Sequence, residues 1–242
     1  MGLKKILFGD YVGVGMDNQK TRAKWIEKTL NNLPHGESIL DAGAGELKNK
    51  VFCEHLKYTS QDFGQYDGIG DGVGIQTDSW DNSKLDIVSD IASMPLEDNA
   101  FDNVFCSEVF EHIPHPVDAA REMIRVLKPG GKLIITAPFC SLTHFAPYHF
   151  YNGFNTYFYE KWLEEFGCEI IEMTPNGNYF EYVAQEVMYA SEMGVKYANV
   201  SMSFREKIGQ KLFLGFLKRA TKKGDKSKEV LNFGIHVIAQ KK

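Results

Sequence analysis

Cysteine is sparse in this chain, and its spacing excludes a disulfide framework. The chain has 242 residues and four cysteines, Cys53, Cys106, Cys140 and Cys168, and no two of them form a C-x-x-C pair. Small secreted domains that depend on disulfides are much richer in cysteine, and zinc ribbons need paired cysteines. We therefore expect reduced thiols, because a chain of this length buries a sufficient core without a covalent staple.

Long apolar runs are also missing. No stretch approaches the roughly 18 apolar residues of a membrane-spanning helix. The first ten residues, MGLKKILFGD, lack the apolar segment of a signal peptide. We expect a soluble, cytoplasmic protein.

An excess of basic charge is absent as well, since the net charge is −5. Between Arg205 and Lys228, however, nine Lys or Arg stand against two acids, so the remainder of the chain carries 18 basic and 30 acidic residues. An acidic body argues against nucleic-acid binding, which needs a basic face. Segment 205–228 also has an apolar face, which leaves open weak membrane-surface contact, a polyanionic substrate or an ordinary solvated helix end.

What the chain does have is a glycine-rich turn in SILDAGAGEL, residues 38–47. An apolar run suited to a buried parallel strand breaks into Ala42-Gly43-Ala44-Gly45, and we expect a helix from about Glu46. Glycines let the backbone approach a ligand closely, and a helix N-terminus offers free N–H groups to an anion. The pattern indicates a nucleotide-like ligand.

An acidic residue suited to ribose hydroxyls follows at Asp62, after the strand-like KYTSQD. A dinucleotide fingerprint, G-x-G-x-x-G, would need a third glycine where Lys48 stands. The spacing therefore argues against NAD, and a dehydrogenase remains the rival interpretation.

Five segments in one order carry a resemblance to a known family. They are ILDAGAGEL, the acid Asp62, SDI at 89–91, CSEVFEHI at 106–113 and LKPGGKLIITAP at 127–138. The series resembles class I S-adenosylmethionine-dependent methyltransferases of the small-molecule type over about residues 35–175. The resemblance implies the cofactor S-adenosyl-L-methionine and the product S-adenosyl-L-homocysteine.

The same resemblance implies an α/β fold, with a Rossmann-like, seven-stranded and mostly parallel sheet, helices on both faces and an antiparallel last strand. We expect a single methyltransferase domain over 1–242, with an N-terminal lid or helix at 1–34 and a helical insertion at 176–230. The expected strands are 38–41, 57–61, 86–91, 101–106, 132–137, 169–174 and 231–239. The expected helices are 17–33, 46–56, 116–127, 156–166, 179–193 and 204–220.

The resemblance also carries over a set of cofactor-binding residues. It implies that Asp90 reaches the adenine amino group and that segment 107–112 lies beside the methionine part of the cofactor and the acceptor. The set is Asp41, Ala42, Gly43, Gly45, Gln61, Asp62, Phe63, Asp90, Ile91, Ser107 and Glu108.

A glycine-rich segment, residues 63–85, follows Asp62 where a crossover helix would be usual. Loops of this length are uncommon in compact domains unless they are functional. We expect part of it to lie near the cofactor or the acceptor, with a surface insertion as the alternative.

The stretch after the fifth strand, residues 139–155, is dense in histidines and aromatics and leaves the sheet at its ligand-binding edge. We predict His144 and His149 as candidate general bases, with His112 in reserve, because histidine is the usual base for a hydroxyl. A packed loop with buried, hydrogen-bonded histidines is the alternative. The predicted acceptor-binding residues are Tyr148, Tyr151 and Phe139.

The sequence does not predict a metal site. Glu108, Glu111, His112 and His115 are close together, but their spacing fits no standard zinc pattern.

These observations favour O-methylation of a small hydroxylated molecule. A sugar, as a nucleotide-sugar or polysaccharide precursor, is the hypothesis, because PYHFYNGF and PNGNYFEY are loosely similar to methyltransferases linked to surface-polysaccharide biosynthesis. A small-molecule N- or C-methyltransferase and a methyltransferase-like subunit without turnover stay open. So does a homodimer, since the sequence does not fix the oligomeric state.

Overall fold

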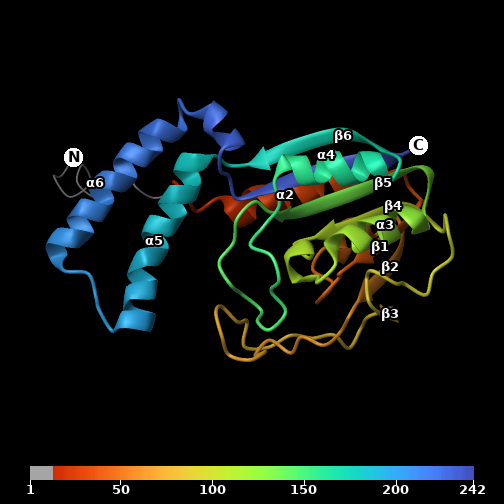
Figure 1. Cartoon of the computed structure of the whole chain (residues 1–242), viewed down its shortest axis with the longest axis horizontal. Coiled ribbons are helices and arrows are strands. Elements are labelled where there is room, and N and C mark those ends of the chain that lie inside the picture. Colours follow the sequence, from red (N-terminus) through yellow and green to blue (C-terminus); the bar gives the residue numbers. More distant parts are fainter. Residues whose placement is uncertain (1–12) are drawn as a thin grey trace. The chain divides into compact units, whose positions relative to one another are not determined.

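The computed structural model describes residues 13–242 (Figure 1). Residues 1–12, which include much of the predicted lid, lie outside the described residues. The chain divides into two compact units, a sheet unit of residues 22–174 with 234–242, and a helical unit of 175–233 with residues up to 21. Each unit is described by itself, and the single domain over 1–242 stays a prediction.

The sheet unit is built on seven strands in the order β3-β2-β1-β4-β5-β7-β6 (Figure 1). Neighbours from β3 to β5 pair in parallel, and β7 runs antiparallel to β5. The predicted Rossmann-like sheet with an antiparallel last strand is therefore confirmed. The strands are β1 (Ser38–Ala42), β2 (Lys57–Asp62), β3 (Ile87–Val88), β4 (Phe101–Ser107), β5 (Leu127–Pro138), β6 (Cys168–Asn176) and β7 (Gly234–Lys241).

Helices cover both faces of the sheet because each presents an apolar stripe. Ile26 and Leu30 pack against Ile39 on one face, and Met123 and Tyr159 belong to the core on the other face. Met123 lies on α3 and Tyr159 on α4, and Figure 1 shows these two helices lying along the sheet. The helices are α2 (Asn18–Asn31), α3 (Pro116–Val126) and α4 (Thr156–Glu165).

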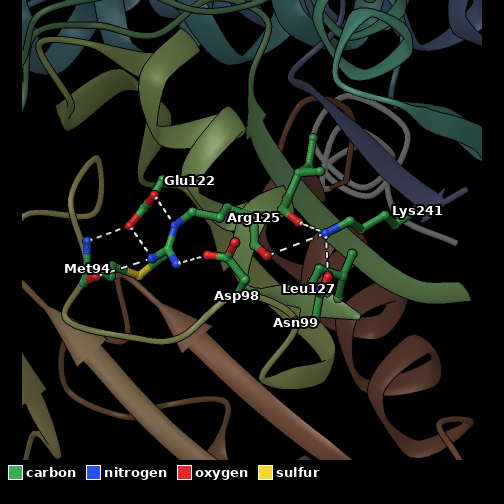
Figure 2. A network of polar contacts seen from close by, with 8 residues as sticks. Met94, Asp98, Asn99, Glu122, Arg125, Leu127 and Lys241 are labelled. Atoms are coloured by element: carbon green, nitrogen blue, oxygen red, sulfur yellow. Dashed lines mark hydrogen bonds and ion pairs between the residues drawn. The ribbon is translucent and has the colours of Figure 1, made fainter. Parts of the chain in front are cut away.

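A polar network fastens the end of α3 at the edge where the parallel strands begin (Figure 2). The Arg125 guanidinium donates to Glu122 at 2.8 Å and to Asp98 at 2.6 Å. The Lys241 ammonium donates to three backbone carbonyls around the end of α3, at 2.7, 2.7 and 3.4 Å. This edge is opposite the carboxyl edge of the parallel strands, where the predicted site lies, so we assign the network a structural role.

The helical unit consists of α5 (Tyr179–Ala198), α6 (Phe204–Thr221) and the short 3-10 helix η3 (Asp225–Glu229). Its own apolar core contains Ala184, Leu214 and Leu217. Ser203 and Glu206 form a capping box at the start of α6. No helix among residues 13–242 is both long and apolar enough to span a membrane.

Two predicted elements are longer than expected, since the strand expected at 132–137 begins at Leu127 and the helix expected at 179–193 continues to Ala198. Two others are much shorter. The helix expected at 46–56 is only a 3-10 turn, η1 (Lys50–Cys53), because Leu47 has a left-handed backbone with φ of 61°. The strand expected at 86–91 is reduced to Ile87–Val88 at the end of the sheet. The side chain of Asp86 instead accepts hydrogen bonds from the Ser60 backbone N–H and hydroxyl, at 2.8 and 2.7 Å.

Candidate functional site

The glycine-rich turn lies at the carboxyl end of β1, beside the point where the strand order reverses between β1 and β4. Gly43 has φ of 80°, and a Cβ there would meet the Val109 side chain at 2.3 Å. Gly45 has φ of 51°, and a Cβ there would meet the Trp80 ring at 2.6 Å. Both positions therefore require glycine for the conformation and for the space.

The backbone N–H groups of this turn are used inside the protein. Gly43 and Ala44 donate to the Gln61 carbonyl at 2.8 and 2.9 Å, and Gly45 donates to Asp62 Oδ2 at 3.0 Å. The expected helix N-terminus with free N–H groups is therefore wrong. Instead, the turn and Asp62 form one unit that fixes the ends of β1 and β2 together.

Asp62 keeps capacity for a ligand in this arrangement. Its two oxygens accept from Gly45 and Gly64, at 3.0 and 2.9 Å, and each carboxylate oxygen has a second lone pair. A ribose hydroxyl can donate to these without displacing the backbone bonds.

Asp41 is buried beneath the turn. Burial raises its pKa to about 7, and the nearby Asp62 charge adds to this rise. The Tyr58 hydroxyl, which donates to Asp41 Oδ2 at 2.6 Å, acts in the opposite direction and lowers the pKa. Asp41 therefore acts as an internal support of the turn rather than as an exposed ligand group.

The remaining predicted cofactor residues line the same carboxyl edge. Gln61 donates to the Ser89 carbonyl at 2.7 Å, and Asp90 accepts from the Ala92 backbone at 2.8 Å, so Asp90 caps its own turn. Ile91 is buried in the core. The Phe63 ring packs edge-on against Tyr148, with ring centroids 4.9 Å apart.

Glu108 is held by two groups in a left-handed conformation with φ of 55°. Arg22 Nη1 donates to Glu108 Oε2 at 2.5 Å, and the Thr136 hydroxyl donates to Oε1 at 3.0 Å. Ser107, the next predicted residue, shares a hydrogen bond of 2.8 Å with Thr136. No local pattern indicated Arg22, because it stands far from Glu108 along the chain.

Loop 63–85 contacts both the glycine turn and the histidine-rich stretch. The Trp80 ring lies against Gly45 and edge-on to Phe145, with ring centroids 5.4 Å apart. Further along, Ile75 pairs with His144 in an isolated parallel bridge, and the Phe145 N–H donates to the Ile75 carbonyl at 2.9 Å. The loop therefore joins two segments of the predicted site, and its nearness to the cofactor or the acceptor stays a prediction.

The structure brings the three predicted histidines together. The ring centroids are 4.6 Å apart for His112 and His144, 4.9 Å for His144 and His149, and 5.9 Å for His112 and His149. The Glu111 carboxylate lies among them, with Oε1 at 3.7 Å from His112 Nε2 and 3.9 Å from His144 Nε2. We call these four residues the histidine cluster.

Burial sets the protonation of the cluster. Burial, followed by the nearby His144, lowers the pKa of His112 to about 3, and burial lowers the pKa of His144 and of His149 as well. Burial and then Glu108 raise the pKa of Glu111. The imidazoles are therefore neutral at ordinary pH.

The predicted acceptor stretch, residues 139–155, is anchored beside this cluster. Its Phe150 and Tyr151 N–H groups donate to the Glu111 carbonyl at 2.8 and 3.2 Å. Tyr151 also lines a cavity of about 430 Å³ at the start of α3. Phe139 directly follows β5, is partly buried and packs against the large core of the sheet unit, whereas Tyr148 packs against Phe63.

The cavity is lined mainly by apolar and aromatic residues, with a few polar side chains among them. The lining residues are Pro114, His115, Pro116, Val117, Asp118, Tyr151, Gly153, Phe154, Asn155 and Phe158.

Comparisons with known proteins agree with this fold. Residues 70–135 match the family model of a methyltransferase domain. An uncharacterized protein of Mycobacterium tuberculosis is 26% identical over 170 residues, which are 64% of this chain and 51% of that protein. The chain thus spans about half the length of the curated relatives that it matches first.

Two named methyltransferases are also similar. A ubiquinone/menaquinone biosynthesis C-methyltransferase of Pseudomonas fluorescens is 41% identical over 49 residues, 20% of this chain and 19% of that protein. The solved structure of phosphoethanolamine N-methyltransferase 2 of Haemonchus contortus, in complex with S-adenosyl-L-methionine, covers 98% of this chain and 55% of its own, with a TM-score of 0.50 and 19% identity.

The sheet order and the matched segment define a Rossmann-like methyltransferase fold. Residues 70–135 thus carry the sequence signature of a methyltransferase domain, and the chain has the fold of class I S-adenosylmethionine-dependent methyltransferases.

Proposed function

We propose that the protein transfers the methyl group of S-adenosylmethionine to a hydroxyl of a small molecule. The observation that carries the proposal is the histidine cluster at the carboxyl edge of the sheet. Two of its members, Glu111 and His112, lie on the 3-10 helix η2 (Phe110–His112), which follows β4 and the predicted cofactor residue Glu108. A neutral imidazole at such a place suits a hydroxyl acceptor, whose pKa is far above 7 and which gains from a positioned base.

Methyl transfer from a sulfonium is an in-line displacement with a good leaving group. The protein must therefore hold donor and acceptor collinear and exclude water, and for a hydroxyl it must also take up a proton. Among the three histidines His149 is the least buried, and its Nε2 lies 3.2 Å from the Ser141 hydroxyl. We assign the role of base to His149 first, with His144 and His112 as the other candidates.

The acceptor that we propose is a sugar, as a nucleotide-sugar or polysaccharide precursor. The cavity of about 430 Å³ supports this choice, because Tyr151 and Phe158 offer flat apolar surfaces and His115 and Asn155 offer polar groups. Sites for small polar molecules commonly combine such surfaces with a few placed polar groups.

A C-methyltransferase is the second candidate, because the relative from Pseudomonas fluorescens carries that activity in its name. A neutral nitrogen acceptor attacks with its own lone pair and needs no base of this kind, and a carbon acceptor does not require deprotonation of an ordinary hydroxyl. The double variant His144→Ala/His149→Ala discriminates, since turnover that survives in it favours the N- or C-methyltransferase over the O-methyltransferase.

Calorimetric titration with S-adenosylmethionine, S-adenosylhomocysteine and NAD tests the donor. We expect micromolar binding of the first two, loss of that binding in Asp62→Ala, and no change in the surface control Asp225→Ala. Preferred binding of NAD would contradict the proposal.

A screen of nucleotide-sugars then tests the acceptor. Turnover should fall more than threefold in His149→Ala or His144→Ala, which corresponds to a loss of more than about 0.65 kcal/mol in transition-state stabilisation. If both variants stay within threefold of the parent, the base assignment is wrong.

Membrane-surface contact through segment 205–228 and a homodimer stay proposals. In α6, Phe204 and Leu212 are more than half exposed beside the basic residues, as an interfacial helix would require. Sedimentation with anionic and neutral vesicles tests the contact, and light scattering of the purified protein tests the dimer. Equal recovery with both vesicle types would contradict an electrostatic contribution.

A further inference from the structure

Within the histidine cluster, Glu111, His112 and His144 present three acceptor atoms to one point. A carboxylate oxygen and two imidazole nitrogens lie within 4.8 Å of one another. Glu111 is only 1% exposed, and both its Oε2 and His112 Nε2 are buried without a hydrogen-bond partner in the described part of the chain. Since buried polar atoms are nearly always partnered, these neighbouring orphans indicate a ligand.

The tautomers of the two histidines strengthen this argument. His112 Nδ1 lies 2.5 Å from the Tyr148 carbonyl, and His144 Nδ1 lies 2.8 Å from the Leu142 carbonyl. A carbonyl only accepts, so each Nδ1 carries the proton and each Nε2 of the neutral ring has a bare lone pair. Both lone pairs therefore face the Glu111 carboxylate, an arrangement that is repulsive unless a proton or a cation lies between them.

We propose that the Glu111 carboxylate and the Nε2 atoms of His112 and His144 bind one divalent transition-metal cation of the Zn²⁺ type. Two imidazoles and one carboxylate form a donor set suited to such cations, and a carbonyl bonded to the opposite ring nitrogen is the usual support of a metal-binding histidine. The sequence alone did not indicate the site, because His144 comes from a different loop than the other two ligands.

The geometry needs only small adjustments to hold the cation. Zinc bonds of about 2.1 Å place tetrahedral ligands about 3.4 Å apart. The observed separations from Glu111 Oε1 are 3.7 and 3.9 Å, and the third is within 4.8 Å. Side-chain shifts of less than about 1 Å each close the site and leave the remaining coordination position open.

The role of the cation rests on the proposed function. The cation would bind the acceptor hydroxyl at its open coordination position and lower the pKa of that hydroxyl, as bound cations do for water. In the transfer, the C–S bond of the sulfonium breaks and its electron pair stays on sulfur, while the acceptor oxygen forms the new C–O bond. The hydroxyl proton goes to His149, which lies beside His144 but outside the ligand group.

Metal binding is measured on the full chain after chelator treatment, by titration with Zn²⁺ and by the visible absorption of bound Co²⁺. We expect one cation per chain in the parent and at least about tenfold weaker binding in Glu111→Gln and in His144→Gln. His35→Gln is the control, because His35 is exposed and lies outside both the ligand group and the acceptor cavity, and this variant should bind the cation as the parent does.

Two results would overturn the site: a parent that binds no cation, or Gln variants that bind as tightly as the parent. S-adenosylhomocysteine binding and the thermal midpoint of each metal-free variant are measured in parallel. If the Gln variants retain both but lose the Co²⁺ absorption, the loss belongs to the ligands and supports the site. A variant that fails these checks is replaced by His112→Gln, which is judged by the same criteria.

Turnover separates the site from the proposed function. Loss of O-methylation on chelation, restored by Zn²⁺ or Co²⁺, supports the catalytic role, and undiminished turnover after metal removal would contradict it. If a cation binds with the expected variant pattern but no hydroxyl acceptor is methylated, the site stands and the proposed O-methylation fails.

Discussion

Gly43 illustrates how one residue sets the cofactor turn. Its φ of 80° is strained for any side chain, and a Cβ would overlap Val109 at 2.3 Å. We expect Gly43→Ala to weaken S-adenosylmethionine binding by at least tenfold, or about 1.4 kcal/mol, because the turn must shift to relieve the overlap. Calorimetry measures this affinity.

Gly36 offers a matched control for that substitution. Its φ is 82°, nearly the same, but a Cβ there would meet no atom within 4 Å. Gly36→Ala should therefore cost about 1–2 kcal/mol of unfolding free energy through backbone strain and leave cofactor affinity unchanged. Equal losses of affinity in both variants would show that the overlap with Val109 is not the cause.

Asp41 makes stability depend on pH in a direction that follows from its environment. The folded protein holds the Asp41 proton up to a pKa of about 7, against 3.8 for a free carboxyl. Between these values the folded state binds more protons than the unfolded state, so the free energy of unfolding falls as pH rises. Across this pH range the free energy of unfolding falls by roughly 4 kcal/mol in all because of this group.

We expect Asp41→Asn to remove this slope while its amide oxygen still accepts from the Tyr58 hydroxyl. Urea unfolding at pH 5 and pH 8 should show that the variant gains stability relative to the parent at the higher pH. Asp225→Asn, whose side chain is 87% exposed, is the control. Parallel pH profiles for Asp41→Asn and the parent would contradict the assignment.

At this scale the sequence predicts residues whose role depends on their neighbours in the chain. Gly43 and Gly45 follow a strand directly, so their role could be read locally. Arg22 and Trp80 could not, because each contacts the site from a distant segment and carries no local pattern.

At the scale of elements, Lys241 on β7 stabilises the end of α3 (Figure 2). Its ammonium donates to the Ile124, Arg125 and Leu127 carbonyls at the helix end, where the carbonyls lack the regular partners of the helix interior. We expect Lys241→Met to lower the free energy of unfolding by about 1–2 kcal/mol, toward the lower value because water can reach the edge. Lys242→Met, at the next position, should change it little, and a similar loss in both would attribute the effect to net charge.

Amphipathic helices and buried strands were predicted well, because α2, α3 and β4 have clear apolar periodicity. The helix expected after the glycine turn failed because the left-handed Leu47 interrupts it, which no periodicity reveals. The strand before Asp90 is short because the side chain of Asp86 takes the backbone N–H of Ser60.

At the scale of the whole chain, the two units have separate cores. The apolar clusters of the sheet unit contain only its own residues, and the same holds for the helical unit. The Phe233 N–H donates to the Asn176 carbonyl at 2.9 Å, so a short turn can join the ends of β6 and β7.

We therefore expect a chain with residues 178–232 replaced by a short glycine-containing turn to unfold cooperatively. It should bind S-adenosylmethionine within about threefold of the parent affinity, a difference of about 0.65 kcal/mol. Denaturant unfolding and calorimetry check both. A non-cooperative or non-binding product would show that the helical unit completes the cofactor site.

Loop 63–85 joins two places that the reaction must occupy together. Trp80 rests on the cofactor turn, and Ile75 pairs with His144 in the acceptor stretch. A ligand that moves one end of the loop therefore changes the free energy of binding at the other, and such coupling is reciprocal. The factor by which S-adenosylhomocysteine alters Zn²⁺ affinity must equal the factor by which Zn²⁺ alters S-adenosylhomocysteine affinity. Trp80→Ala should bring both factors toward one.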